Sequence, residues 1–397
     1  MISVQEAQSL ITKHIRSGPT VSRHLKSASG YVLAENILSP IDMPPYRQSA
    51  MDGYAVCFHP GNEYEVKGEV QAGSSQNPDL APGDAIRIFT GGRVPDDANA
   101  IVMQEHVQRQ GDIIRLSNHV NIYNGQHIRP RGEQITEGEV ALRANTYLGP
   151  SAIGFLASIG VQELEVYAKP RVCVIVTGNE LTPIGVSLRS GQVYESNSHA
   201  LHSALKDLGI EEIQIHHVRD DAQATEDIIQ KALAESDAVL ITGGISVGDY
   251  DHVAGALERL GVDTIFYKVR QKPGKPLFFG QQGSIPVFAL PGNPAAVITA
   301  FYEYVYPGLQ RLQGLPGNGM MRQSLPSTHA YTKKGDRAQF LKARCVNQQV
   351  EILDGQASSM MRSMSIANAF VFMDVHQTSV QAGDLVEVHL LPNQYAP

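Results

Sequence analysis

A glycine-rich turn with two acids, at residues 240–251 (LITGGISVGDYD), carries the clearest chemical signal in this sequence. Its chemistry-bearing residues are Gly243, Gly244, Ser246, Gly248, Asp249 and Asp251. Glycines let a backbone approach a ligand closely, and successive amides in such a turn can form a cradle for an anion. Carboxylates repel phosphate unless a divalent cation lies between them, so the combination indicates phosphate with magnesium. Taken alone, the segment is also typical of a glycine turn followed by an aspartate helix cap. It is not a Walker A loop, because no GK[ST] follows.

A second segment, residues 268–279 (KVRQKPGKPLFF), places four cations within eight residues of a net acidic protein. These cations are Lys268, Arg270, Lys272 and Lys275. Prolines and a glycine stiffen the loop between them. A rigid loop with several cations suits phosphate or an oxyanion such as molybdate. A solvated basic loop with no ligand is the alternative.

Further polar residues follow other predicted strands. Glu180 ends the strand that leads into TGNEL, and Asp220 follows the strand that leads into VRDD. The turn LPGNP at residues 290–294 places Pro291 and Pro294 around a tight connection that can line a pocket. Because parallel strands end at one edge of a sheet, these groups are expected to share a site with the glycine turn. Each of them alone is also an ordinary turn former.

The N-terminal half holds weaker candidates. Asp52 precedes a glycine in SAMDGYAV, Thr90 begins the turn TGGR, and Arg129 belongs to a charged cluster in IRPRGEQI. A solvated surface loop explains each of these as readily as a ligand contact does.

The chain is organised as a multidomain α/β plus β protein. Apolar spacing predicts a mainly helical first ~40 residues, and short strands and turns are expected from there to about residue 145. Apolar strands alternate with amphipathic helices from 171 to about 312, which predicts a doubly wound α/β domain with a largely parallel sheet. The last ~70 residues return to short strands. We place domains at 1–168, with an inserted subdomain at about 46–135, at 169–313, and at 320–397.

Composition limits the function classes. The 397 residues are 42% hydrophobic and 18% charged with a formal net charge of −8, which disfavours a nucleic-acid surface. The three cysteines are far apart and form neither a CxxC pair nor a disulfide pattern, so a reducing cytoplasm fits. The sequence shows no signal-peptide pattern at residues 1–15, and no apolar run reaches about 18 residues, so no membrane association is expected.

Taken together, the motifs resemble one family. SAMDGYAV, RIFTGGRVP, AIVMQE, IRPRGEQI, VIVTGNEL, VYESN, VRDD, TGGISVGDYD, KPGKPLFFG and LPGNP occur in order along nearly the whole chain. This set resembles the molybdopterin molybdotransferases, the bacterial MoeA family, and the E domain of gephyrin. Residues 171–312 look like the Mog/MoaB fold of molybdopterin adenylyltransferases, and the resemblance implies a small C-terminal domain like a β-barrel.

The resemblance implies an activity and its partners. Adenylylated molybdopterin and molybdate would become molybdenum cofactor and AMP, with Mg²⁺ required. An elongated homodimer would build each active site from two chains. Transient contact with a molybdopterin adenylyltransferase and with later cofactor-maturation proteins would follow.

The resemblance also assigns residues. Asp249, Asp251, Glu180, Asp220 and Asp52 match catalytic acids, with Asp251 and Glu180 as metal ligands. Substrate-binding positions match Gly243, Gly244, Ser246, Gly248, Lys268, Lys272, Lys275, Pro291, Pro294, Thr90 and Arg129. In the family Asp52, Thr90 and Arg129 would reach the site from the second subunit.

Two positions depart from the family pattern. Gln134 stands where the family commonly has an acid, so this position is not expected to bind a cation. The segment SSMMRSMSIAN matches the family's serine-rich motif only loosely, which leaves Ser363 as a weak candidate. The alternatives are a molybdopterin adenylyltransferase, which usually needs only the α/β domain, and a non-enzymatic scaffold of the gephyrin kind.

Overall fold

The computed structural model describes residues 1–118, 120–245 and 252–392. Ser246, Gly248, Asp249 and Asp251 therefore lie outside the described residues. The chain divides into two compact units. One comprises Met1–Val21, Gly30–Ala34 and Glu165–Pro397, and the other comprises Ser22–Ser29 and Glu35–Leu164. Strands β1 (Thr20–His24) and β12 (Glu163–Tyr167) carry the chain from one unit to the other.

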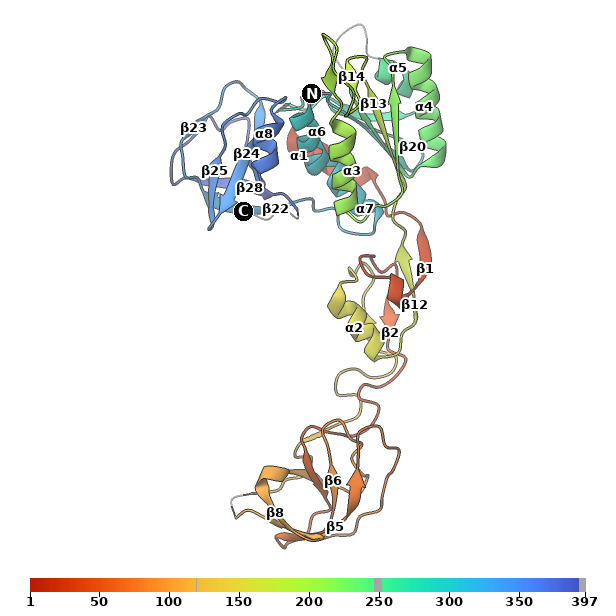
Figure 1. The fold of residues 1–397 in the computed structure, drawn as a ribbon, viewed down its shortest axis with the longest axis vertical. Helices are drawn as coiled ribbons and strands as arrows, with labels where there is room; N and C mark the ends of the chain where they lie inside the picture. Colours follow the sequence, from red (N-terminus) through yellow and green to blue (C-terminus); the bar gives the residue numbers. More distant parts are fainter. Residues whose placement is uncertain (119, 246–251, 393–397) are drawn as a thin grey trace. The chain divides into compact units, whose positions relative to one another are not determined.

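The smaller unit is mainly β, as its short strand-like runs predict. A six-stranded sheet has the order β7-β4-β6-β5-β9-β8 (Figure 1). Its strands are β4 (Gly53–Val56), β5 (Glu63–Val70), β6 (Asp84–Ile88), β7 (Ala100–Met103), β8 (Val107–Gln110) and β9 (Ile113–Leu116). Short antiparallel pairs join β3 (Gln48–Ser49) to β10 (Ile128–Arg129) and β2 (Ile37–Leu38) to β11 (Val140–Leu142). Helix α2 (Pro150–Ser158) and the 3-10 turns η1 (Leu25–Ser27) and η2 (Gln104–His106) complete it.

In the larger unit a second six-stranded sheet has the order β16-β13-β17-β21-β20-β18. Strands β16 (Ile213–Val218), β13 (Val172–Thr177), β17 (Ala238–Thr242) and β21 (Ile285–Leu290) run parallel. Strands β20 (Phe278–Gln282) and β18 (Asp263–Tyr267) pair antiparallel at one side. The fold is the α/β class that the alternation of strands and helices predicts.

Helices cover both faces of this sheet because alternate side chains of β13 point to opposite sides. Val172, Val174 and Val176 join a core with α1 (Val4–His14), α3 (Asn197–Asp207), α6 (Pro294–Ala300) and α7 (Tyr306–Leu312). Cys173 and Ile175 join the other core with α4 (Ala222–Glu235) and α5 (His252–Arg259). Figure 1 shows α3 and α6 on one side of the sheet and α4 and α5 on the other. Burial raises the pKa of the Cys173 thiol to about 11, so this cysteine is a core residue.

The C-terminal domain is a third sheet of order β19-β24-β26-β28-β22, with β25 paired to β24. Its strands are β19 (Gln271–Lys272), β22 (Met321–Pro326), β24 (Ala338–Val346), β25 (Gln349–Ile352), β26 (Ala369–Met373) and β28 (Leu385–Leu390). Strands β23 (Tyr331–Thr332) and β27 (Ser379–Val380) form a small pair, and α8 (Met361–Ile366) lies beside the sheet (Figure 1). Strand β19 comes from the α/β domain, so the basic loop and the C-terminal domain share one sheet.

The prediction that the first ~40 residues are mainly helical was wrong beyond the first helix. Helix α1 ends at His14, and β1 begins at Thr20. Gly18 and Pro19 stop the helix, and β-branched Thr20 and Val21 favour strand. Apolar residues at helical spacing extend only to Ile15, which is why the rest of the first ~40 residues is not mainly helical.

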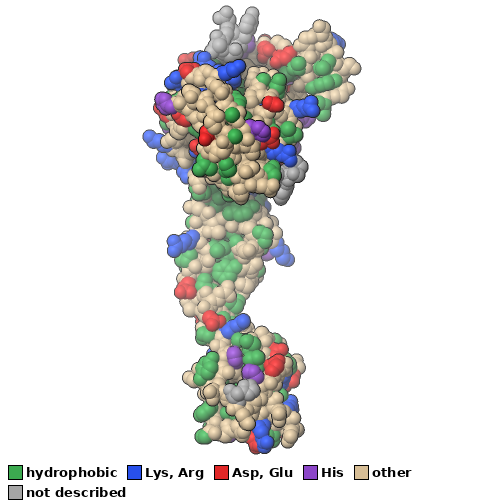
Figure 2. All heavy atoms as spheres, turned by 90° about the vertical axis from the view of Figure 1, so that its left-hand side faces the viewer, with side chains coloured by type: hydrophobic (Ala, Val, Ile, Leu, Met, Phe, Trp, Pro, Cys, Tyr) green, Lys and Arg blue, Asp and Glu red, His purple; other side chains and the backbone are tan. Residues whose placement is uncertain are grey.

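Charged side chains of both signs are interspersed on the face shown in Figure 2. Among the described residues, every helix is too short or too polar to span a bilayer.

A buried ionic pair ties the α/β domain to the C-terminal sheet. Glu303 lies in the π-helical turn η3 (Phe301–Val305) between α6 and α7 and is only 3% exposed. Its Oε1 lies 2.7 Å from Nδ1 of His389, and Gln8 donates to its Oε2 at 3.0 Å. Burial alone would lower the pKa of His389, but the Glu303 carboxylate and the hydrogen bonds to Glu303 and Glu387 raise it to about 9. We conclude that His389 is protonated at neutral pH.

This pair makes the stability depend on pH. A histidine pKa raised above the unfolded value of about 6.5 contributes fully below pH 6.5 and is lost as pH rises through about 9. The free energy of unfolding should fall by roughly 1–3 kcal/mol over that window through His389. Urea unfolding of wild type and His389→Gln at pH 6, 7.5 and 9 measures it. Equal pH slopes for the two proteins would contradict the assignment.

Candidate active site

The loops after four parallel strands meet at one edge of the α/β sheet. Residues 178–180 follow β13, 219–221 follow β16, 243–245 follow β17, and 291–293 follow β21. Neighbouring strands β16, β13, β17 and β21 place these loops side by side. Ligands of open α/β sheets bind at this edge, beyond the carboxyl ends of the strands.

A cavity of about 890 Å³ lies among these loops. Its lining includes the predicted residues Glu180, Asp220, Gly243, Gly244, Lys272, Lys275, Pro291 and Pro294. It also includes Thr177, Asn197, Tyr194, Arg337, Ser358 and Ser359. The structure therefore brings together most of the residues that the sequence proposed from the α/β domain.

Glycine is required at two positions in the turn after β17. Gly243 has φ +84°, and a Cβ there would lie 2.4 Å from the carbonyl oxygen of Thr177. Gly244 has φ +64°, and its Cβ would lie 2.8 Å from the Thr177 hydroxyl. Both positions therefore need glycine, because their backbones have positive φ and a side chain would collide with Thr177.

Two carboxylates lie on adjoining loops of the cavity. Asp220 accepts a hydrogen bond from the Asn179 amide at 3.2 Å, and the Asp220 amide donates to Asn179 Oδ1 at the same distance. This reciprocal pair joins the loop after β16 to the loop that carries Glu180. Both Glu180 and Asp220 are exposed, so they are open to a cation or a substrate.

The basic loop presents two of its lysines to the cavity. Gln271 is fully buried and supports the loop, accepting from the Tyr304 hydroxyl and donating to the Gly274 carbonyl at 3.1 Å. Lys272 and Lys275 line the cavity and are exposed. Lys268 does not line it. The Lys268 backbone has φ +76°, and its Nζ lies 4.8 Å from the centre of the Tyr267 ring.

The C-terminal domain adds residues that sequence reasoning missed. Arg337, Ser358 and Ser359 line the cavity. Ser358 accepts from the Ala295 amide and from Asn293 Nδ2, both at 3.0 Å, so its loop is fixed to the start of α6. The loose serine-rich motif was the available signal, but it pointed to Ser363. The hydroxyl of Ser363 donates to Gly355 and Met360 carbonyls within its own turn, and Ser363 does not line the cavity.

Polar atoms in the wall of the cavity are left without partners among the described residues. They are Thr177 Oγ1 and Asn197 Oδ1, on residues that are 5% and 7% exposed. The amide nitrogen of Asn197 donates to Thr242 Oγ1 and to the Gly292 carbonyl, each at 2.9 Å. A buried polar atom without a partner is costly, and both atoms are themselves inaccessible in this structure.

The N-terminal candidates belong to the smaller unit. Asp52 Oδ1 accepts from the Thr90 amide at 2.7 Å and from the Thr90 hydroxyl at 2.8 Å. These two hydrogen bonds lower the pKa of Asp52, which is therefore an exposed carboxylate at neutral pH. Arg129 is exposed in β10. The Gln134 amide donates to the Met43 carbonyl at 2.9 Å, beside the antiparallel bridge between Met43 and Ile135, and its side chain is neutral.

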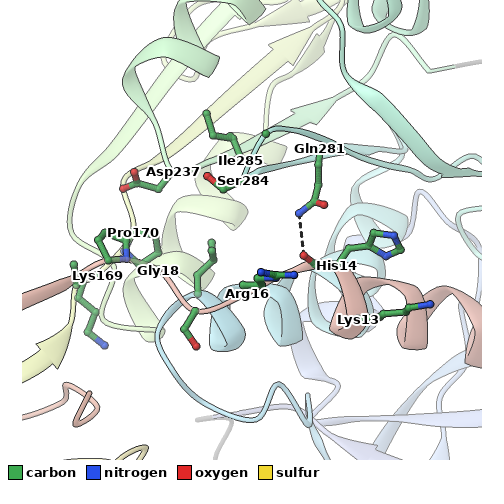
Figure 3. Close-up of a pocket in the computed structure, with 15 residues that line it drawn as sticks. Lys13, His14, Arg16, Gly18, Lys169, Pro170, Asp237, Gln281, Ser284 and Ile285 are labelled. Atoms are coloured by element: carbon green, nitrogen blue, oxygen red, sulfur yellow. Dashed lines mark hydrogen bonds between the residues drawn. The ribbon is translucent and has the colours of Figure 1, made fainter. Parts of the chain in front are cut away.

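Another cavity, of about 590 Å³, lies at the opposite end of the strands of the α/β sheet and is lined by Lys13, Arg16 and Lys169 (Figure 3). Its cations do not converge. Lys13 and Lys169 extend in opposite directions in Figure 3, and the Lys169 ammonium donates to Gln313 Oε1 at 2.5 Å. Asp237 in the same lining is paired with Arg171 at 3.0 Å. The cavity at the carboxyl edge is the better candidate because exposed charged groups of both signs, Glu180, Lys272 and Lys275 among them, line it.

Comparison with known protein families gives three matches along the chain. Residues 2–160 match the MoeA N-terminal region (domain I and II), 173–311 a probable molybdopterin binding domain, and 324–391 the MoeA C-terminal region (domain IV). The three matches cover both units and the cavity described above.

Whole-chain relatives agree with these matches. A molybdopterin molybdenumtransferase of Haemophilus influenzae is 31% identical over 98% of this chain and 100% of its own length. One from Nostoc sp. is 37% identical over 73% of this chain and 69% of its own. The crystal structure of a molybdopterin biosynthesis MoeA protein from Pyrococcus horikosii superposes with a TM-score of 0.85 at 30% identity, covering 99% of this chain and 100% of that one. This chain belongs to the MoeA family of molybdopterin molybdenumtransferases.

Proposed function

We propose that this transferase of molybdenum cofactor biosynthesis inserts molybdate into adenylylated molybdopterin and releases AMP. The observation that carries the proposal is the cavity at the sheet edge, where Lys272, Lys275 and Arg337 face a glycine turn and two carboxylates. A substrate with phosphates and an oxyanion as co-substrate needs cations, and a cation-dependent cleavage needs acids. The cavity supplies both from the described residues alone.

The cations have a clear task in this reaction. The substrate joins two phosphates through an anhydride, and molybdate adds a further dianion. Lys272 and Lys275 extend from a loop held by Gln271, and Arg337 comes from the neighbouring C-terminal strand region. Fixed cations offset the charge that develops on the phosphate oxygens as the anhydride bond breaks. They also raise the local concentration of molybdate.

The acids fit a magnesium ion. Magnesium prefers oxygen ligands and usually takes one or two carboxylates together with water and substrate phosphates. Glu180 and Asp220 are exposed carboxylates on adjoining loops of the cavity and would hold it. Asp251, which the family resemblance assigns as a further ligand, lies outside the described residues, and substrate phosphates and water would complete the shell. A bound magnesium ion would polarise the phosphoanhydride.

The remaining wall orients the substrate. Gly243 and Gly244 line the cavity without side chains, so a phosphate on their side of the wall would meet backbone groups. Thr177 and Asn197 belong to the same wall. Asn197 also holds the proline turn through the Gly292 carbonyl. The dithiolate of the substrate supplies the soft sulfur ligands that replace molybdate oxygens.

A molybdopterin adenylyltransferase is the main alternative. That reaction uses ATP and forms the phosphoanhydride instead of breaking it. The MoeA-type N-terminal and C-terminal matches and the lining contributed by Arg337 and Ser358 favour the insertion step.

AMP release tests the proposal directly. Purified wild-type chain, adenylylated molybdopterin and magnesium should release AMP, and adding molybdate should accelerate the release. Chromatography of the nucleotide measures it. Formation of adenylylated molybdopterin from ATP, with no AMP release on adding molybdate, would assign the alternative activity.

Removal of one cavity lysine tests whether the basic loop takes part in the reaction. Lys275→Ala should lower kcat/KM for AMP release by about 10- to 100-fold, because a charge-assisted contact to the substrate is lost. Lys231→Ala, in the exposed part of α4, is the matched control and should stay close to wild type. Equal kcat/KM for Lys275→Ala and wild type would remove the basic loop from the mechanism.

We also propose that the enzyme is a homodimer with composite sites. Support comes from the exposed Asp52 carboxylate, which Thr90 fixes in place although the cavity lining lies wholly in the larger unit. The family resemblance assigns Asp52, Thr90 and Arg129 to the site of a second copy.

Subunit mixing tests this arrangement. Asp52→Ala and Glu180→Ala should each be inactive alone. After the two are unfolded together and refolded, half of the dimers would be mixed, and one of the two sites in each mixed dimer would be intact. About a quarter of wild-type activity should then return. No recovery, with mixed dimers demonstrated by two affinity tags, would show that each site belongs to one chain.

A further inference from the structure

An aromatic side chain stands at the rim of the cavity. Tyr194 ends β15 (Val193–Tyr194), which pairs parallel with β14 (Leu181–Thr182). Among the described residues that line the cavity it is the only aromatic one. It is 47% exposed, although a tyrosine in a strand normally packs one face against a neighbour. This exposure leaves a ring face available to a ligand.

The backbone beneath Tyr194 is fixed on both sides. Val193 donates to the Glu180 carbonyl, and Glu195 donates to the Thr182 carbonyl, both at 2.9 Å. The buried Glu195 carboxylate accepts from the amide and the hydroxyl of Ser198 at the start of α3. The ring is thus carried on a rigid support beside the acid-bearing loop that ends at Glu180.

The ring itself has no partner within the described residues. No hydrogen bond to its hydroxyl and no ring or cation contact to it occurs there. Its neighbours in the lining, Leu181 and Val193, are apolar, and Val193 is 51% exposed. The rest of the lining is glycine, proline, charged or small polar residues with few apolar exceptions. The Tyr194 ring, with Leu181 and Val193 beside it, therefore offers a flat apolar part of the substrate a surface to rest on.

We infer that Tyr194 is a substrate-positioning residue that stacks on a planar nitrogen heteroaromatic ring of the adenylylated substrate. The inference rests on the proposed function, because that substrate carries two such rings, the adenine and the pterin. Stacking on an aromatic side chain is tolerant of ring identity and is worth about a 5- to 100-fold change in affinity. The phosphates then lie toward Gly243, Gly244 and the lysines, and the ring lies over Tyr194.

Fluorescence tests the stacking without catalysis. The chain contains no tryptophan, so Tyr194→Trp places a single indole at the rim. AMP, pterin and ribose 5-phosphate are titrated separately with magnesium present. Saturable quenching by AMP identifies the adenine, quenching by pterin identifies the pterin ring, and ribose 5-phosphate should give none. Leu385→Trp, at a position 69% exposed in the C-terminal sheet, is the control and should not respond. The inference fails if neither ring quenches the indole emission of Tyr194→Trp or if the control responds equally.

Kinetics separate this inference from the proposed function. Tyr194→Phe keeps the ring and should retain the wild-type KM for adenylylated molybdopterin within about twofold, whereas Tyr194→Leu should raise KM by about 5- to 100-fold with kcat little changed. Circular dichroism verifies the fold of each variant. If wild type releases AMP and both variants keep its KM, the stacking is wrong and the function stands. If wild type releases no AMP, the function fails, and the fluorescence result decides the stacking alone.

Discussion

The parallel alignment of β13, β17 and β21 is the constraint on which the site depends. Each strand is buried along its whole length or nearly so, and each ends at the same edge of the sheet. The loops after them cannot continue as strands because glycine, proline and polar residues follow at once. Backbone positions at this edge are therefore fixed by the core, while the side chains of the loops stay free for a ligand. Gly243 shows how tight this is, since a single Cβ would reach the Thr177 carbonyl.

Most of the cavity residues at this edge of the sheet could be predicted from the sequence, and the reason is physical. The apolar runs mark the strands, and a parallel sheet brings their ends together without further information. Glu180, Asp220 and Pro291 were predicted in this way and Lys275 from the density of cations in its loop, and the structure places all four around one cavity. The family resemblance then named the chemistry that such an edge performs.

Other features depended on contacts that no local pattern encodes. Arg337 and Ser358 reach the cavity because β19 pairs with β24, a contact between segments more than 60 residues apart. Lys268 is turned away by a positive φ that its residue type does not predict. Apolar spacing in α1 was correctly recognised as helical, but it said nothing about the strand that follows Pro19. Each of these depends on tertiary contacts or backbone geometry, which local residue type does not specify.

The contacts that attach the C-terminal domain to the α/β domain also determine the site, because they bring Arg337 and Ser358 to the cavity. Among the contacts that hold this domain to the α/β domain are three on different elements: the β19–β24 pairing, the hydrogen bonds from Asn293 and Ala295 to Ser358, and the buried Glu303–His389 pair. The first two lie directly beside the cavity, and the third lies farther along the helical run α6–η3–α7. A hydrogen bond or ion pair alone would allow the domain to pivot, but three contacts on different elements do not. Arg337 donates to the Gln271 carbonyl and Ser358 accepts from Asn293, so both are fixed in the lining that also includes Lys272 and Lys275. Preorganised charge of this kind needs little rearrangement as the reaction proceeds.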